Sequence, residues 1–272
     1  MNNVIKRADG RRADQLRPFS IHIDSFGYAD GSVIVSLGQT KVLCAVTLQT
    51  GVPPFLKGKR TGWLTAEYAL MPTSTQTRSQ RDSNQKINGR SVEISRLIGR
   101  SLRTVVDLNK LGERTITIDC DVLQADGGTR TACITGAFIA LRRAEAQWLK
   151  EGLIIESVIV DELAAISAGV KNGVALLDID YAEDSTIDAD YNFVLTRSGS
   201  IVEIQGTTEA KAIAWPLFND MCHLATQGIK DIFGLIDKAE VKKTAKQEHI
   251  PAMNAVSRGL SDALKKYTLS SE

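Results

Sequence analysis

Two kinds of periodicity follow one another along this chain, and they constrain the fold more than any other feature of the sequence. Positions 32–37, 41–48 and 63–70 alternate between apolar and polar residues, which predicts three strands. From position 91 to about 106, apolar residues return every three or four positions. That spacing predicts an amphipathic helix after the strands.

The same order of strands and helices returns in the rest of the chain. An alternating strand pattern at 115–124 is followed by a helix pattern rich in Ala, Ile and Leu from about 131 to 150. Further strand patterns and a closing helix pattern lie at 163–170, 174–180, 191–196, 201–205 and about 216–237. The repetition predicts an α+β fold built from a duplicated β-α unit.

The duplication also predicts how the chain is divided. We expect a core over residues 1–240 in two halves, approximately 1–110 and 111–240, without a linker between them. The more polar residues 241–272 form a C-terminal extension to which the sequence assigns no role. No stretch approaches the roughly 18 uncharged apolar residues of a membrane span, and the polar N-terminus has no apolar signal region, so we expect a cytoplasmic location.

Charge is unevenly spread, although the formal net charge is only +1. Residues 57–103 hold ten Lys and Arg against three Asp and Glu, whereas residues 151–220 hold three against thirteen. The first stretch could bind a polyanion and the second a cation. On charge alone, two solvated faces that neutralise each other are the favoured interpretation.

A glycine-rich turn before the second helix is the first candidate site. The segment ADGGTRTA at 125–132 places two glycines ahead of a helix start, whose free N–H groups and positive dipole end favour an anion. Arg130 adds a guanidinium fork that fits phosphate. A tight turn capped by Thr129 explains the same residues if they are considered alone.

An acidic run is the second candidate site. Asp178 and Asp180 share one face at strand spacing, and the chain can bring Asp184 alongside them. Crowded carboxylates hold a divalent cation, or one of them stays protonated as an acid. A surface turn with ordinary acidic residues remains the alternative for this motif on its own.

A resemblance to a known family adds to these patterns. Long blocks of the chain resemble bacterial ribonuclease PH, and they occur in the order of that family. Among these blocks are DGRRADQLRP (9–18), VPPFLKG (52–58), GWLTAEY (62–68), GRSVEISRLIGRSLR (89–103) and DCDVLQADGGTRTA (119–132). The resemblance implies the ribosomal protein S5 domain 2-like fold and a homohexameric ring made of three dimers. It also implies a phosphorolytic 3′-to-5′ exoribonuclease, a tRNA nucleotidyltransferase that trims tRNA precursors and other structured RNAs such as rRNA with inorganic phosphate.

The resemblance further implies roles for individual residues. The phosphate-binding residues are expected to be Arg90, Gly128, Thr129 and Arg130. Asp178 and Asp184 match the acidic pair that holds Mg²⁺ and assists protonation of the leaving group, and the motif leaves open which residue does which.

RNA binding is expected in the polar loop at 72–89. Arg78 and Arg81 match a loop that holds the tRNA acceptor stem in the family, but Thr73 stands where most members carry arginine, which predicts a weaker hold on tRNA. The alternative function is a non-catalytic RNA-binding ring subunit of the same superfamily. The presence of the arginines and both aspartates in one chain favours the enzyme.

Overall fold

A computed structural model describes residues 7–23, 26–81, 88–209 and 211–248 of the protein. The described residues up to Phe233 belong to one compact unit, and those from Gly234 belong to a second. Among the described residues, no helix is long and apolar enough to cross a membrane.

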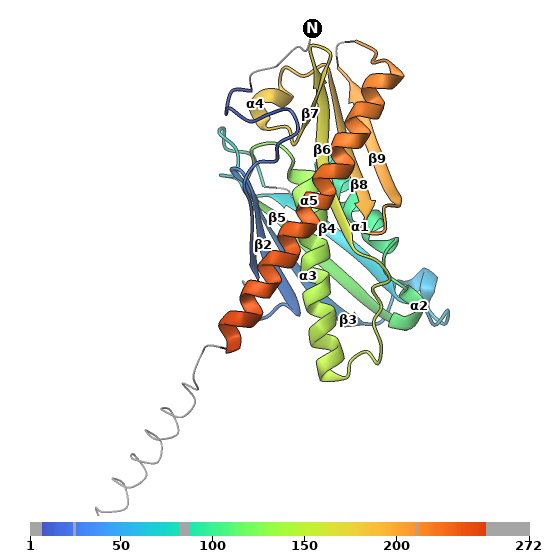
Figure 1. Ribbon diagram of the computed structural model, residues 1–272. Coiled ribbons are helices and arrows are strands. Elements are labelled where there is room, and N and C mark those ends of the chain that lie inside the picture. Colours follow the sequence, from blue (N-terminus) through green and yellow to red (C-terminus); the bar gives the residue numbers. More distant parts are fainter. Residues whose placement is uncertain (1–6, 24–25, 82–87, 210, 249–272) are drawn as a thin grey trace, which may run out of the picture. The chain divides into compact units, whose positions relative to one another are not determined.

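The first sheet has five strands in the order β1-β2-β3-β5-β4 (Figure 1). Their bounds are Phe19–Ile23 for β1, Gly31–Leu37 for β2, Thr40–Thr50 for β3, Trp63–Leu70 for β4 and Arg114–Gln124 for β5. All neighbours are antiparallel except β4 and β5, which run parallel. A parallel pair needs a long crossover, and helix α1 (Gly89–Arg103) lies within that connection.

The second sheet has four antiparallel strands in the order β7-β6-β8-β9. Its strands are β6 (Leu163–Lys171), β7 (Val174–Leu177), β8 (Ala189–Thr196) and β9 (Ile201–Thr208). The hairpin between β6 and β7 turns at Asn172 and Gly173, where both residues have positive φ angles, 50° and 76°. An Asn-Gly pair suits such a turn because both residues tolerate that conformation.

Helix α3 (Thr129–Glu151) packs against both sheets, contacting β2 and β3 of the first sheet and β6 of the second (Figure 1). This position explains its apolar sequence, because a helix covered on several sides has no wide polar face. Strand β2 approaches it so closely that a Cβ on Gly31 would lie 2.3 Å from the carbonyl oxygen of Ala140. The middle of α3 thus packs directly against β2.

Four further helical segments complete the described chain: η1 (Pro54–Leu56), α2 (Leu108–Leu111), α4 (Tyr181–Asp184) and α5 (Trp215–Glu248). The short α4 begins with a capping box, in which the Asp180 side chain accepts from the Glu183 backbone and Glu183 accepts from Asp180. Such a reciprocal cap stabilises a single helical turn.

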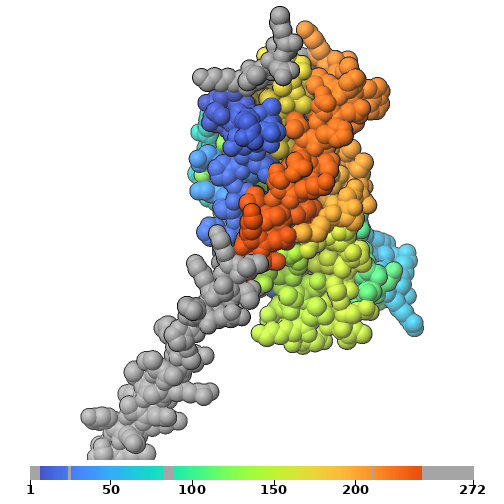
Figure 2. Space-filling model, in the orientation of Figure 1, coloured from blue at the N-terminus to red at the C-terminus, as the bar shows by residue number. Residues whose placement is uncertain are grey.

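The N-terminal segment, residues 7–17, lies against α4 and the end of β7. The backbone N–H of Leu177 donates to the carbonyl of Ala13 over 2.7 Å, and the Arg7 guanidinium donates to the Glu183 carboxylate. In the space-filling view, the blue N-terminal residues and the yellow residues of this region are neighbours (Figure 2). Two parts of the chain about 170 residues apart therefore share one surface.

The predicted α+β fold class is confirmed, and each expected strand and helix is present, most of them with shifted ends. The sequence patterns did not predict β1, a strand of only five residues. The strand expected over 174–180 ends at Leu177, because Asp178 takes a positive φ of 53°. The helix expected over 216–237 runs to Glu248.

The sheets divide the chain differently from the two predicted halves. Strand β5 pairs with both β3 and β4, so a division near residue 110 cuts through the first sheet. We propose instead that the division follows α3, between Glu151 and Leu163. Of the predicted extension, residues 241–248 continue α5, and residues 249–272 lie outside the described residues.

Candidate active site

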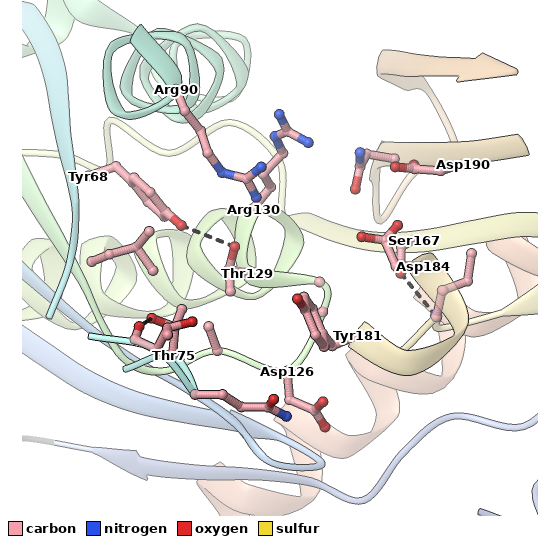
Figure 3. A pocket seen from close by; sticks show the side chains of 18 residues that line it. Tyr68, Thr75, Arg90, Asp126, Thr129, Arg130, Ser167, Tyr181, Asp184 and Asp190 are labelled. Carbon is pink, nitrogen blue, oxygen red and sulfur yellow. Dashed lines mark hydrogen bonds between the residues drawn. The ribbon is translucent and has the colours of Figure 1, made fainter. Parts of the chain in front are cut away.

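A cavity of about 330 Å³ opens beside the N-terminus of α3 (Figure 3). Residues from both sheets, from α1, α3 and α4 and from the loop after β4 meet around it. The charged and hydroxyl-bearing residues among them are Tyr68, Thr75, Thr77, Arg90, Asp126, Thr129, Arg130, Ser167, Tyr181, Asp184 and Asp190. Two arginines and three carboxylates share one concave space, which is the kind of place where a charged ligand binds.

The glycine-rich turn forms one wall of this cavity. Gly127 and Gly128 have positive φ angles of 74° and 66°, and Gly128 is the residue before the first turn of α3. A Cβ on Gly127 would lie 2.7 Å from the Ile179 carbonyl oxygen, so the turn touches the segment that leads into α4. Among the described residues no side chain caps α3, so its first N–H groups present a positive end that favours an anion.

Thr129 is held at this helix start by Tyr68. The two hydroxyl oxygens are 3.1 Å apart, and burial raises the pKa of Tyr68 to about 12. Tyr68 therefore remains a neutral hydroxyl at any physiological pH. It fixes the Thr129 side chain without adding negative charge to the anion site.

Arg90 and Arg130 supply positive charge from two different helices. Arg90 is the second residue of α1 and Arg130 the second residue of α3, and both side chains lie near Thr129 in Figure 3. The guanidinium of Arg130 donates to the Glu93 carboxylate over 2.9 Å, while its Nε is buried and makes no hydrogen bond with the described residues. Part of the donor capacity of Arg130 is thus left for a ligand.

Glu93 orients Arg130. Its other carboxylate oxygen accepts from the side-chain amide of Gln205 over 3.0 Å. Burial alone raises the pKa of Glu93, but the hydrogen bonds from Gln205 and Arg130 outweigh it and hold that pKa below its usual value. Glu93 is therefore ionised, and its hydrogen bonds with Arg130 and Gln205 connect α1, α3 and β9.

Asp184 and Asp190 line the same cavity as Arg90 and Arg130. Burial raises the pKa of Asp184, and the charges of Arg90 and Arg130 offset part of that rise. The pKa of Asp190 is raised by burial and then by the negative charge of Asp184. Two partly buried carboxylates that repel each other hold a divalent cation well, or one of them retains a proton.

Asp178, which the sequence predicted as the partner of Asp184, does not reach the cavity. Its side chain has no exposed surface and accepts three hydrogen bonds from Arg17, through the backbone N–H, Nε and Nη2, over 2.7 to 3.1 Å. The positive φ at Asp178 turns the chain at the end of β7, so strand alternation no longer applies to it. The expectation that Asp178 holds a metal is thus corrected.

Asp190 was missed by the sequence reasoning, although a signal for it exists. It alternates with Asn192 along β8, and both side chains line the cavity while Phe193 belongs to the core. A polar pair at strand spacing beside apolar neighbours marks one polar face of a strand. The pattern was hidden by the larger number of acidic residues just before it.

The other predicted residues divide into two groups. Arg90, Gly128, Thr129, Arg130 and Asp184 all line the cavity. Arg78 and Arg81 are exposed and lie outside it, although three residues of the same loop, Thr75, Gln76 and Thr77, line it. The rest of the predicted RNA loop, residues 82–87, lies outside the described residues.

That loop is hydrogen-bonded to the glycine-rich turn at residues 125–128, which we call the phosphate turn. The backbone N–H of Ala125 donates to the Ser74 carbonyl over 2.8 Å, and Met71 donates to Val122 over 3.0 Å. The charge of Arg81 lowers the pKa of Asp121, although burial raises that pKa overall. Arg81 therefore lies near β5, the strand that leads into the phosphate turn.

Comparison with known proteins identifies the family of the chain. Residues 15–147 match domain 1 of the 3′ exoribonuclease family, and residues 161–228 match domain 2. The chain therefore belongs to the 3′ exoribonuclease family. The interval between the two matches coincides with the connection after α3.

One relative places the chain within this family. The chain is 50% identical to a protein of Bacillus subtilis named Ribonuclease PH, over 85% of this chain and 94% of the relative. The resemblance found from the sequence is thereby confirmed. Phosphorolytic 3′-to-5′ exoribonuclease activity, with phosphate as substrate, follows from membership at this level of identity.

Solved structures agree with the fold. An Archaeoglobus fulgidus exosome with RNA bound to the active site is similar with a TM-score of 0.72 and 22% identity, covering 84% of this chain and 92% of that one. Rice Rrp46 is similar with a TM-score of 0.66 and 21% identity, covering 83% and 97%. At this identity the likeness concerns the fold alone.

Proposed function

We propose that the cavity beside α3 is the catalytic centre, in which inorganic phosphate attacks the last phosphodiester bond of RNA. The observation that carries the proposal is the meeting of Arg90, Arg130 and the start of α3 with Asp184 and Asp190 in one cavity. The first group fits phosphate, and the second fits the reacting end of an RNA chain with its metal ion.

The reaction exchanges one phosphorus–oxygen bond for another. An oxygen of inorganic phosphate bonds to the terminal phosphorus as the bond from that phosphorus to the preceding 3′ oxygen breaks. The leaving oxygen takes a proton and becomes the new 3′-hydroxyl of the shortened RNA, and a nucleoside diphosphate departs. The reverse reaction adds nucleotides from diphosphates at the same site.

The main barrier to the reaction is the electrostatic repulsion between the attacking phosphate and the RNA phosphate. The residues around the cavity can reduce this repulsion. Arg90 and the N–H groups at Thr129 and Arg130 hold the attacking phosphate and neutralise part of its charge. Fixing both reactants in line removes most of the entropic cost. Positioning and electrostatics therefore supply most of the catalysis.

Mg²⁺ is the expected cofactor, and Asp184 with Asp190 would hold it. Mg²⁺ is usually bound by one or two protein carboxylates and completes its coordination shell with water and substrate phosphates. The pair Asp184 and Asp190 meets that requirement. In the described part of the chain, no cluster of three or more His, Cys, Asp or Glu suited to a metal is found. The bound ion would offset the charge that develops on the leaving oxygen.

The substrates that we propose are tRNA precursors and other structured RNA 3′ ends. Arg78 and Arg81 would contact RNA phosphates outside the cavity, because both are exposed in the loop whose residues 75–77 line it. Thr73, in place of the arginine expected from the family, would weaken that contact. A homohexameric ring of three dimers is proposed from the family, and a cytoplasmic location stays a prediction.

The test is to incubate the protein with a 3′-extended tRNA, Mg²⁺ and inorganic phosphate and to identify the released nucleotides. Nucleoside diphosphates are expected, and only when phosphate is present. Release of monophosphates, or shortening of the RNA without phosphate, would show a hydrolytic nuclease instead. RNA binding without any turnover would favour the non-catalytic subunit.

A further inference from the structure

A buried cluster of charged side chains lies behind the cavity. We define this arginine cluster as Arg7, Arg11, Arg17, Asp178 and Glu183, none of which is more than 8% exposed. None of the five lines the cavity. The cluster joins three stretches of the chain, residues 7–17, 126–128 and 177–184.

We infer that Arg17 is a positioning residue of the active site, which fixes the phosphate turn relative to the segment that carries Asp184. This inference rests on the proposed function, because it concerns the alignment of the groups named there. Arg17 acts through its contacts with backbone carbonyls and with Asp178, and it does not line the cavity.

The guanidinium of Arg17 binds both segments at once. On one side it donates to the carbonyls of Asp126 and Gly127, the latter over 3.4 Å. On the other side it donates to the Asp178 carboxylate over 2.7 Å and to the Ile179 carbonyl over 3.3 Å. A planar fork with five donors can bridge two walls in this way, whereas a lysine ammonium cannot reproduce the geometry.

The two bridged segments also touch directly. A Cβ on Gly127 would lie 2.7 Å from the Ile179 carbonyl oxygen and 2.8 Å from the Tyr181 backbone nitrogen. No side chain fits between the phosphate turn and the start of α4. A shift of either segment therefore moves the other, and Arg17 sets their common position.

The rest of the arginine cluster holds α4 itself. Arg7 donates to both carboxylate oxygens of Glu183 over 2.7 and 2.6 Å and to the carbonyls of Leu177 and Asp178 over 2.8 Å. Glu183 precedes Asp184 in α4. The orientation of Asp184 thus depends on a segment at the other end of the sequence.

Alignment of this kind acts on the rate more than on binding. The groups proposed to hold phosphate, Arg90, Arg130 and the start of α3, do not belong to the arginine cluster. Loss of Arg17 therefore leaves their contacts with phosphate in place. The distance between phosphate and the carboxylate pair changes instead, and a displacement of about 1 Å costs roughly a hundredfold in rate. We therefore expect kcat to fall by about that factor while KM for a short RNA changes little.

The experiment compares Arg17→Lys with Arg12→Ala, a matched control on the same segment. The side chain of Arg12 pairs with Asp14, both side chains are largely exposed, and the substitution leaves the Arg12 backbone contacts in place. Each variant is first checked for a native unfolding transition, and kcat and KM are then measured for phosphate and for a short RNA. Arg17→Lys should lose kcat, and Arg12→Ala should behave as wild type.

Two additional measurements keep the inference testable. In Arg17→Ala, guanidinium ion at a non-denaturing concentration should restore part of kcat, because it can occupy the vacated fork; a purely structural defect would not respond in this way. If Arg17→Lys does not fold, Asp178→Asn takes its place, since it keeps the shape and removes the charge that Arg17 binds.

A folded Arg17→Lys or Asp178→Asn variant with wild-type kcat would overturn the inference. Failure of both variants to fold would also count against it, because the contacts would then serve folding itself. Phosphorolysis by the wild type is measured in the same series. If the wild type releases no nucleoside diphosphate, the proposed function fails, and that outcome is distinct from an unaffected variant of an active enzyme.

Discussion

The cavity beside α3 and the arginine cluster behind it are made of the same residue types, but they use them in opposite ways. In the arginine cluster, Asp178 and Glu183 are buried and take their hydrogen bonds from Arg7 and Arg17. In the cavity, Asp184 is exposed, and its negative charge raises the pKa of Asp190, which burial raises first. Charges that are satisfied within the protein build structure, and charges left facing a cavity are available for chemistry.

The comparison is tested most strongly by removing one carboxylate of the cavity. Asp184→Asn and Asp190→Asn should each lower kcat about a thousandfold, roughly 4 kcal/mol, because the amide keeps the shape but loses the charge that holds the cation. Initial rates of nucleoside diphosphate release measure the effect. Asp220→Asn, at an exposed position of α5, is the control. Near-normal rates in both cavity variants would mean that the metal is bound elsewhere.

In the arginine cluster the same kind of change should act on stability. Glu183→Gln leaves Arg7 buried beside a neutral amide, which should lower the free energy of unfolding by about 3 kcal/mol. Chemical denaturation measures this loss, and Asp190→Asn should show little of it. An unchanged denaturation midpoint in Glu183→Gln would show that the buried pair contributes nothing net.

The dependence on pH sharpens this prediction. Burial alone raises the pKa of Glu183, but the Arg7 hydrogen bond and charge outweigh it and hold that pKa below its usual 4.5. The contribution of Glu183 to stability is therefore fully present above pH 4.5 and is lost as the pH falls through the lowered pKa of the folded state. The difference in stability between wild type and Glu183→Gln should shrink below pH 4.5.

The arginines of the cavity should have a smaller effect on turnover than its carboxylates. Arg90→Ala or Arg130→Ala removes one charged contact to phosphate, so KM for phosphate should rise and kcat/KM should fall about a hundredfold. Steady-state kinetics at varied phosphate concentration separates the two constants. Arg100→Ala, an exposed arginine of the same helix as Arg90 that pairs with Glu203, should leave both unchanged. If Arg90→Ala and Arg130→Ala had the same kinetic constants as the Arg100→Ala control, neither Arg90 nor Arg130 would contact phosphate.

The smallest effect is expected outside the cavity. Arg78→Ala/Arg81→Ala should weaken binding of tRNA precursors and flatten the slope of log K against log salt by about one to two units, because each phosphate contact releases counterions. Phosphorolysis of a short oligonucleotide should continue at nearly the same rate. Thr73→Arg should tighten tRNA binding, most at low salt. If the double variant had the same salt slope as wild type, Arg78 and Arg81 would belong to a solvated surface that does not contact RNA.

Much of the cavity could be read from local sequence. The two glycines before α3 predicted a close backbone turn at a helix start, and the structure has that turn, with Thr129 and Arg130 as the first two residues of α3. Anion binding at this turn stays a prediction. Alternation and helical spacing predicted every strand except β1. These features depend on neighbours a few residues apart, and the sequence states them directly.

The choice between the carboxylates could not be read in that way. Spacing placed Asp178 with Asp184, but Asp178 pairs with Arg17, which is 161 residues away in the chain. Asp190 reaches the cavity because β8 lies beside β6 in the second sheet, and Asp184 reaches it because the N-terminal segment holds α4. Which charged side chain meets an arginine and which meets a cavity depends on the packing of distant segments. The sequence by itself determined most of the strands and helices and the turn before α3, and only the tertiary structure decided which aspartates face the cavity.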